Sequence, residues 1–242
     1  METVVPLCTP FTDDGLSVSE VRLARLVRWY RTKQQTRFFV LGECGEFSAV
    51  SPSERKSVVE NVAREASGAE FIVNVTALST STAVDLAQHA ARHGAAAVVT
   101  MPPFYPKLDD EETTSFIHAI ASYAKQPVIV CDPRRSLTEA VKARLAEIPR
   151  LVVAVNRQGS LDDFVAGNWT SSTDVAVLPD RTVRGLTEFL TFSPKAKTVK
   201  AALDAQGLDC GTPRPPQKRL QGEPLTTLKH LLEPPLNTRL PA

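Results

Sequence analysis

The hydrophobic pattern of the chain is a series of short apolar runs separated by longer amphipathic segments. Most runs are continuously apolar and do not alternate with polar residues, which is typical of parallel strands covered on both faces. The pattern predicts seven buried strands, at Thr3–Cys8, Phe38–Leu41, Phe71–Thr76, Ala96–Met101, Pro127–Cys131, Leu151–Val155 and Val175–Leu178. The rhythm weakens after about residue 155, and an eighth strand is not visible.

The segments between these runs have helical periodicity. After Ser17 the apolar residues recur every three or four positions, and Ser17 with Glu20 has capping-box spacing. Alternation of strand and helix predicts a parallel sheet with right-handed crossovers. The predicted helices are Ser17–Arg31, Ser53–Ala66, Thr80–His93 (before Gly94), Glu111–Ala124, Thr138–Ile148, Asp180–Phe192, Lys195–Gln206 and Leu225–Leu232.

Composition and charge limit the partners and the cellular setting that we expect for this protein. Of 242 residues, 43% are hydrophobic and 23% charged, an ordinary globular composition. The formal net charge of +1 gives no reason to expect nucleic acid or an anionic membrane as a partner. We see no signal-peptide pattern and no apolar stretch of membrane-spanning length. The chain has four cysteines, Cys8, Cys44, Cys131 and Cys210, and no two of them form a CxxC motif. We therefore expect a reduced, cytoplasmic setting.

Five short motifs occur in a characteristic order along the chain. They are TPF at 9–11, GECGE at 42–46 (followed by SPSER), PFY at 103–105, CDP at 131–133 and KAAL at 200–203. In this order and spacing they resemble the dihydrodipicolinate synthase/N-acetylneuraminate lyase family of class I aldolases. The chain resembles a diverged and truncated member, because a block of the family pattern that includes the eighth strand is missing between about 180 and 195.

The resemblance implies an α/β fold, a TIM (β/α)8-type barrel with C-terminal helices. Such a barrel needs about 250 residues, and only seven strands are recognisable in this chain of 242. We therefore expect an incomplete barrel. We assign residues 1–192 to the barrel domain, 193–233 to a C-terminal helical extension and 234–242 to a disordered tail.

The resemblance also implies an active site at the C-terminal ends of the strands, with a Schiff-base lysine at the end of the sixth. That amine attacks the keto carbon of a pyruvate-type substrate, and the iminium then acts as an electron sink. Here Asn156 stands at the lysine position, and an amide nitrogen is not nucleophilic. The chain is expected to lack Schiff-base aldolase activity unless another amine substitutes. Lys107, near the predicted mouth, is the candidate; a solvated loop residue is the alternative.

The proton relay that the resemblance implies is also altered. The family has two tyrosines and a threonine there. Tyr105 keeps one tyrosine position, Cys131 replaces the other tyrosine, and Cys44 replaces the threonine. A thiol can carry a proton but lacks the reach of a phenol. These changes, together with the lysine, indicate loss of the original reaction.

Two residues are candidates for substrate binding. Glu43 replaces a second threonine of the family loop, and Arg135 (or its neighbour Arg134) stands where the family binds a carboxylate. A surface arginine after a turn is the alternative. A Glu–Cys neighbourhood could also serve nucleophilic chemistry, but no histidine is placed to activate a thiol. Glu46, which follows a glycine at the end of the loop, is predicted to be structural and to accept backbone hydrogen bonds.

His89 and His93 are four residues apart on a predicted helix, a spacing that can bind a metal ion. We expect no nearby third ligand, and imidazoles in the last turn suit the helix dipole. We therefore expect no metal site. Glycine-rich phosphate loops are absent from the sequence, and we expect no cofactor.

Three functions remain open. The first is an aldolase-inactive family member, a pseudoenzyme that keeps a pocket for a small oxo acid or carboxylate. The second is an active lyase with a modified mechanism, similar to 4-hydroxy-tetrahydrodipicolinate synthase or a 2-keto-3-deoxy sugar acid aldolase. The third is a scaffold or regulatory subunit. Family members form dimers and tetramers, so the resemblance implies a homo-oligomer, or a hetero-oligomer with a paralogue.

Overall fold

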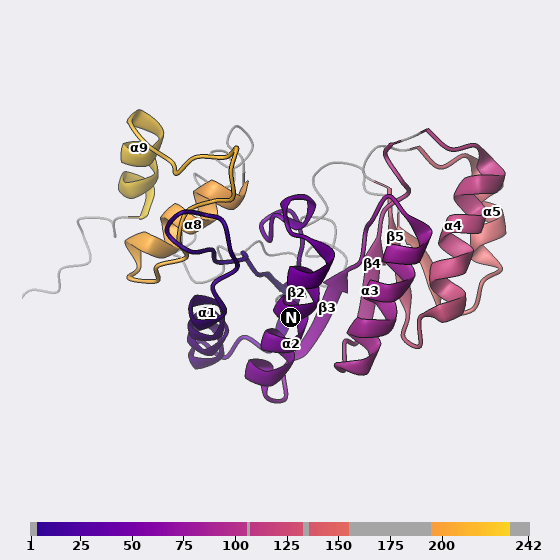
Figure 1. Ribbon diagram of the computed structural model, residues 1–242, viewed down its shortest axis with the longest axis horizontal. Helices are drawn as coiled ribbons and strands as arrows, with labels where there is room; N and C mark the ends of the chain where they lie inside the picture. The colour runs from indigo at the N-terminus through magenta and orange to yellow at the C-terminus, as the bar shows by residue number, and fades with distance from the viewer. Residues whose placement is uncertain (1–3, 106, 133–135, 155–194, 233–242) are drawn as a thin grey trace, which may run out of the picture.

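A single parallel sheet forms the centre of the protein (Figure 1). The computed structural model describes residues 4–105, 107–132, 136–154 and 195–232. The sheet contains β1 (Val4–Pro6), β2 (Arg37–Val40), β3 (Glu70–Asn74), β4 (Ala97–Thr100), β5 (Val128–Cys131) and β6 (Leu151–Ala154). Six of the seven predicted strands are thus confirmed, and the seventh, at 175–178, lies outside the described residues.

The order of the strands is that of a barrel sheet. Every strand pairs in parallel with its sequence neighbours, in the order β1-β2-β3-β4-β5-β6. A doubly wound sheet would change direction at a switch point, whereas a (β/α) barrel adds each strand to the same side of the last. The fold is therefore α/β with a parallel sheet of the barrel type.

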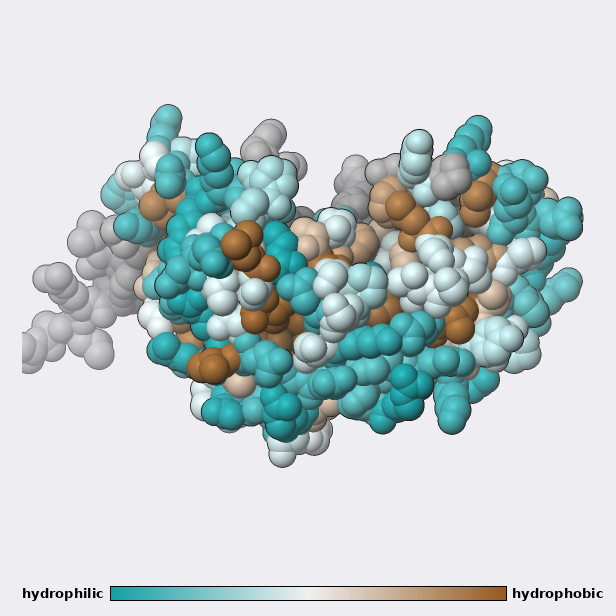
Figure 2. All heavy atoms as spheres, in the orientation of Figure 1, coloured by the Kyte–Doolittle hydropathy of each residue, from teal (hydrophilic) through white to brown (hydrophobic). Residues whose placement is uncertain are grey.

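Helices follow the strands as the sequence pattern predicts. They are α1 (Glu20–Thr32), the short 3-10 helix η1 (Phe47–Ala49), α2 (Pro52–Ala66), α3 (Thr80–Arg92), α4 (Asp110–Tyr123), α5 (Glu139–Ala146), α8 (Lys195–Ala205) and α9 (Glu223–Leu232). The predicted helix at 180–192 lies outside the described residues. Within the part of the chain that is described, no helix is long and apolar enough to cross a membrane. Figure 2 shows that much of the outward surface over α1 and α2 is hydrophilic.

The two faces of the sheet pack into separate apolar clusters. Alternate strand residues such as Phe38 and Val73 pack with the buried residues of the helices, including Leu26 and Val62. The other face contributes almost only strand residues to its cluster: Val4, Phe39, Ile72, Ala97, Val99, Ile129 and Cys131. Side chains of a parallel strand alternate between faces, and the inner face of a barrel is filled in this way.

The predicted start of the first helix is wrong by two residues. The N-cap is Ser19, whose hydroxyl oxygen accepts a hydrogen bond from the Arg22 N–H. Ser17 belongs instead to the turn that precedes the helix. Its carbonyl accepts the Thr12 N–H at 2.9 Å, and its neighbour Val18 forms a β-bridge with Phe11. Residues 17 and 18, which sequence spacing assigned to the helix, therefore lie in a tight antiparallel turn.

The last two described helices lie close to their predicted bounds, and the loop after α8 lies against the start of the chain (Figure 1). Phe11 N–H donates to the Cys210 carbonyl at 3.3 Å. Thr212 Oγ1 donates to the Asp13 carbonyl at 2.9 Å. The C-terminal segment therefore packs directly on the first βα unit.

Candidate functional site

The candidate residues follow the C-terminal ends of three strands. Glu43 and Cys44 come after β2, Tyr105 comes after β4, and Cys131 is the last residue of β5. In a parallel sheet these ends share one edge, which is where barrel enzymes bind substrates. The structure thus places these four residues on loops or strand ends at the same edge of the sheet.

The two cysteines of this edge belong to different surroundings. Cys131 is fully buried, lies in the apolar cluster of the inner face, and pairs in register with Ala154 of β6. Cys44 is also buried but belongs to the cluster between the sheet and the helices. None of the four cysteines, all of which lie in the described part of the chain, forms a disulfide. The inner end of β5 is therefore filled by a small apolar side chain where the resemblance implied a tyrosine.

The loop after β4 is open to solvent. Tyr105 is 73% exposed and the adjacent Phe104 is 42% exposed. Lys107, two residues further along, is also exposed. The predicted residues Asn156 and Arg135 lie outside the described residues, and the described segment that contains β6 ends at Ala154, two residues before Asn156.

Asp132 organises the turn that leaves β5. Its side chain is buried, and Oδ1 accepts hydrogen bonds from the Ser136 N–H at 2.8 Å and the Ser136 hydroxyl at 2.9 Å. Oδ2 accepts the Leu137 N–H at 2.8 Å. A carboxylate with three such donors serves to fix the loop. Sequence reasoning used this residue only as part of a motif and missed its structural role.

A buried polar network holds the end of β3. Arg55 of α2 donates to the Asn74 carbonyl at 2.6 Å and to the Thr76 carbonyl at 2.8 Å. Burial lowers the pKa of Arg55 to about 10. Thr76 Oγ1 donates to Asn74 Oδ1 at 2.6 Å and accepts the Met101 N–H at 3.1 Å. Side chains on α2, β3 and the loop after β4 are thereby tied together at the edge of the candidate site.

The prediction that Glu46 is structural is confirmed. Its Oε2 accepts the backbone N–H of Arg214 at 2.9 Å. Its Oε1 also lies 2.7 Å from Lys200 Nζ, in an ion pair whose side chains are only 1% and 2% exposed. Lys200 Nζ lies 4.2 Å from the centre of the Phe11 ring. Sequence reasoning missed this pair; a lysine on the apolar face of α8 was the only signal for it.

Arg214 completes the same group of contacts. Its guanidinium binds Glu54 in bidentate fashion, with both N···O distances 2.7 Å. This partner lowers the pKa of Glu54 to about 2. The guanidinium also donates to the Leu16 and Ala49 carbonyls at 2.7 and 3.0 Å. Lys200 and Arg214, both from the C-terminal segment, therefore stabilise the loop between β2 and α2.

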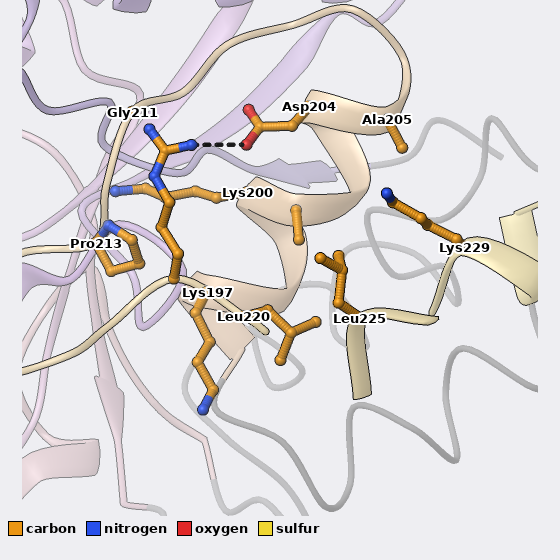
Figure 3. A pocket seen from close by; sticks show the side chains of 11 residues that line it. Lys197, Lys200, Asp204, Ala205, Gly211, Pro213, Leu220, Leu225 and Lys229 are labelled. Carbon is orange, nitrogen blue, oxygen red and sulfur yellow. Dashed lines mark ion pairs between the residues drawn. The ribbon is translucent and has the colours of Figure 1, made fainter. Parts of the chain in front are cut away.

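A pocket of about 290 Å³ lies between α8, α9 and the loop that joins them (Figure 3). It is lined by Lys197, Lys200, Ala201, Asp204, Ala205, Gly211, Pro213, Arg219, Leu220, Leu225 and Lys229. Arg219 pairs with Asp204 at 3.8 Å. The pocket is basic and is formed by the C-terminal segment, and its lining includes none of the predicted site residues.

The histidine pair has a third neighbour that the sequence did not predict. Glu60 of α2 places Oε1 2.9 Å from His89 Nε2, and the ligand atoms of Glu60, His89 and His93 all lie within 4.8 Å of one another. The expectation that no third ligand is near was therefore wrong. Burial lowers the pKa of His89, which disfavours the imidazolium required by the helix-dipole explanation.

Comparisons with known proteins agree on the fold. The model of the Dihydrodipicolinate synthetase family matches residues 1–178. The structure is similar to dihydrodipicolinate synthase from Agrobacterium tumefaciens, with a TM-score of 0.81 and 20% identity over 96% of this chain and 97% of that one. It is also similar to N-acetylneuraminate lyase from Mycoplasma synoviae, with a TM-score of 0.78 and 18% identity over 95% and 96% of the two chains.

Curated relatives match a part of the chain. A 4-hydroxy-tetrahydrodipicolinate synthase from Bartonella quintana is 34% identical over 138 residues, which are 56% of this chain and 47% of that protein. A DapA-like lyase from Pyrococcus abyssi is 33% identical over 127 residues, 52% of this chain and 42% of that protein. The chain thus spans about half the length of the curated relatives it matches.

Proposed function

Since the chain belongs to the dihydrodipicolinate synthetase family, we propose that it keeps the family's barrel scaffold but not Schiff-base aldolase chemistry. One observation carries the proposal: the sequence contains no lysine between Lys142 and Lys195. That interval includes all of β6 and the stretch 155–194 that follows its C-terminal end. Asn156 stands at the position that the resemblance assigns to the nucleophile, so the amine needed for an iminium is missing there.

Neither Lys200 nor Lys107 is a suitable substitute. The amine of Lys200 lies 2.7 Å from Glu46 Oε1 and 4.2 Å from the Phe11 ring centre, two contacts that stabilise a positive charge. Lys107 is exposed to solvent and lacks the desolvation that activates a lysine nucleophile. The surroundings of Lys200 and of Lys107 therefore both support the loss of Schiff-base aldolase chemistry.

The proposed ligand is a small oxo acid or carboxylate bound at the strand ends. The family scaffold around this edge is maintained by Asp132, Asn74 and Glu46, each held by several hydrogen bonds or an ion pair. Arg135 supplies a guanidinium in the sequence at the position that the resemblance assigns to carboxylate binding. We expect binding without turnover, in a cytoplasmic setting.

Borohydride trapping tests the proposal. The protein is incubated with pyruvate and sodium borohydride, and the intact mass is measured. We expect no adduct on the wild-type chain and a pyruvyl adduct on Asn156→Lys, with Asn156→Met as the matched control. An adduct on the wild type overturns the proposal. Absence of an adduct on Asn156→Lys contradicts the retained pocket.

A second candidate function is a non-catalytic subunit of a larger assembly. The observation that favours it is the pair of adjacent exposed aromatic residues, Phe104 and Tyr105. Exposed aromatic side chains that lie together often mark a protein contact. Light scattering after size exclusion, alone and with a co-expressed paralogue, tests this role. A monomer in both samples contradicts it, and Tyr105→Ser weakens any assembly that uses this loop.

A further inference from the structure

We propose that Glu60, His89 and His93 form a site for a divalent transition-metal ion of the zinc type on the outer surface of the barrel. The three side chains come from two neighbouring helices, α2 and α3. Two imidazole nitrogens and one carboxylate oxygen are a ligand set that zinc accepts, with water in the fourth position. The inference is independent of the proposed function, because the site is on the helices and not at the strand ends.

The spacing of the ligand atoms suits one small ion. All three lie within 4.8 Å of one another, and His89 Nε2 is 2.9 Å from Glu60 Oε1. Ligand atoms about 2.0 Å from a tetrahedral ion are about 3.3 Å apart. Small side-chain rotations therefore bring the three atoms around an ion without movement of either helix.

The hydrogen bond of His93 fixes its tautomer for metal binding. Its Nδ1 lies 3.0 Å from the backbone carbonyl of His89, which can only accept a hydrogen bond. Nδ1 therefore carries the proton, and Nε2 keeps the lone pair that a metal needs. A backbone carbonyl that orients an imidazole in this way is a common second contact of metal-binding histidines.

The exposure of the Glu60 side chain allows an ion to enter the site from solvent. The Glu60 side chain is 49% exposed, so the carboxylate can reach an ion that enters from solvent, while the His89 side chain is 8% exposed and held in place. When the ion binds, it replaces the proton between His89 Nε2 and Glu60, and that proton moves to Nδ1 of the same neutral ring. The ion then links α2 to α3.

A neighbouring charge pair provides a matched control. Lys56 and Asp85 lie one helical turn before Glu60 and His89, and Lys56 Nζ is 2.6 Å from Asp85 Oδ2. This pair joins the same two helices without contributing to the proposed ligand set. Asp85→Asn therefore removes an inter-helix contact but leaves all three ligands.

The test is zinc and cobalt binding to the full chain, produced without a histidine tag and freed of metal with a chelator. Calorimetry measures the zinc stoichiometry and affinity, and cobalt absorption identifies nitrogen and oxygen ligands as opposed to thiolates. We expect one ion per chain. We expect at least about a ten-fold loss of affinity in His93→Ala and Glu60→Gln. We expect no change in Asp85→Asn or in His118→Ala, which removes an isolated exposed histidine.

Three outcomes overturn the proposal. They are the absence of stoichiometric zinc binding, binding that is unaffected in His93→Ala, and a cobalt spectrum dominated by thiolate bands. Circular dichroism of His93→Ala separates loss of a ligand from loss of the fold, since this half-buried residue at the end of α3 is replaced without opening the core. Zinc should also raise the melting temperature of the wild type, and not that of His93→Ala.

Discussion

Replacing Lys200 with methionine removes the positive charge from the buried ion pair and leaves the Glu46 carboxylate in the core. The two side chains are 2% and 1% exposed, with Nζ 2.7 Å from Oε1. Methionine keeps most of the volume and suits a helix, so packing changes little. Removing one partner of a buried pair costs about 3–5 kcal/mol. The contact with Phe11 is lost as well.

The matched control is Lys142→Met on α5. Lys142 also lies 2.7 Å from its partner, Glu139, but those side chains are 24% and 90% exposed. An exposed pair contributes less than about 1 kcal/mol. The two substitutions therefore share chemistry and N···O distance and differ in burial. Urea unfolding followed by circular dichroism gives the free energy of unfolding of each variant.

A double variant separates the ion pair from other effects of the substitution. Adding Glu46→Gln to Lys200→Met removes the uncompensated charge, so part of the lost stability should return. We expect a coupling energy of at least about 1 kcal/mol between the two positions. If Lys200→Met costs no more than Lys142→Met, or if the two single effects simply add, the reasoning from burial is refuted.

Two further predictions concern the β2–α2 loop and the helix that follows it. Arg214 lowers the pKa of Glu54 from 4.5 to about 2, so this carboxylate stabilises the native state above about pH 4.5 and the contribution disappears as the pH falls toward 2. Urea unfolding between pH 6 and 2 should show a shallower pH dependence for Glu54→Gln than for the wild type, whereas the exposed Glu111→Gln should follow the wild type; equal slopes for all three would contradict the role of Arg214. Ser51→Ala removes the N-cap of α2 and should cost about 1 kcal/mol, or about 2–4 °C in melting temperature. Ser79→Ala at α3, where the N-cap side chain accepts no cap hydrogen bond, is the control, and an equal loss in both variants would show that capping is not the cause.

The sequence was most informative about the strands, because burial on both faces leaves a continuous apolar run. Phe38–Leu41 and Pro127–Cys131 predict β2 and β5 to within one residue at each end. The N-cap of the first helix was predicted at Ser17, whereas the structure has it at Ser19. Only the turn between Thr12 and Ser17 decides in favour of Ser19. Local spacing cannot reveal such a contact.

Side-chain partners that are distant in the sequence account for most of what was missed. Glu46 was expected to be structural, but its partner Lys200 is 154 residues further along. Glu60 lies 29 residues before His89, and only the packing of α2 against α3 brings them together. The strand-end candidates could be placed at one edge of the sheet, whereas the separation of Cys44 and Cys131 into different clusters depends on side-chain direction.

The contacts of Arg214 have a consequence for the order of events during synthesis. This residue binds Glu54 and the Leu16 carbonyl, which were made 160 and 198 residues earlier. A chain that leaves the ribosome from its N-terminus must therefore wait for nearly its whole length before the first βα units gain these partners. Contacts this distant in sequence slow folding, and the nascent barrel depends on its last fifth for completion. Ribosome-stalled chains that end before residue 200 should consequently be far more sensitive to protease than chains that extend past α9.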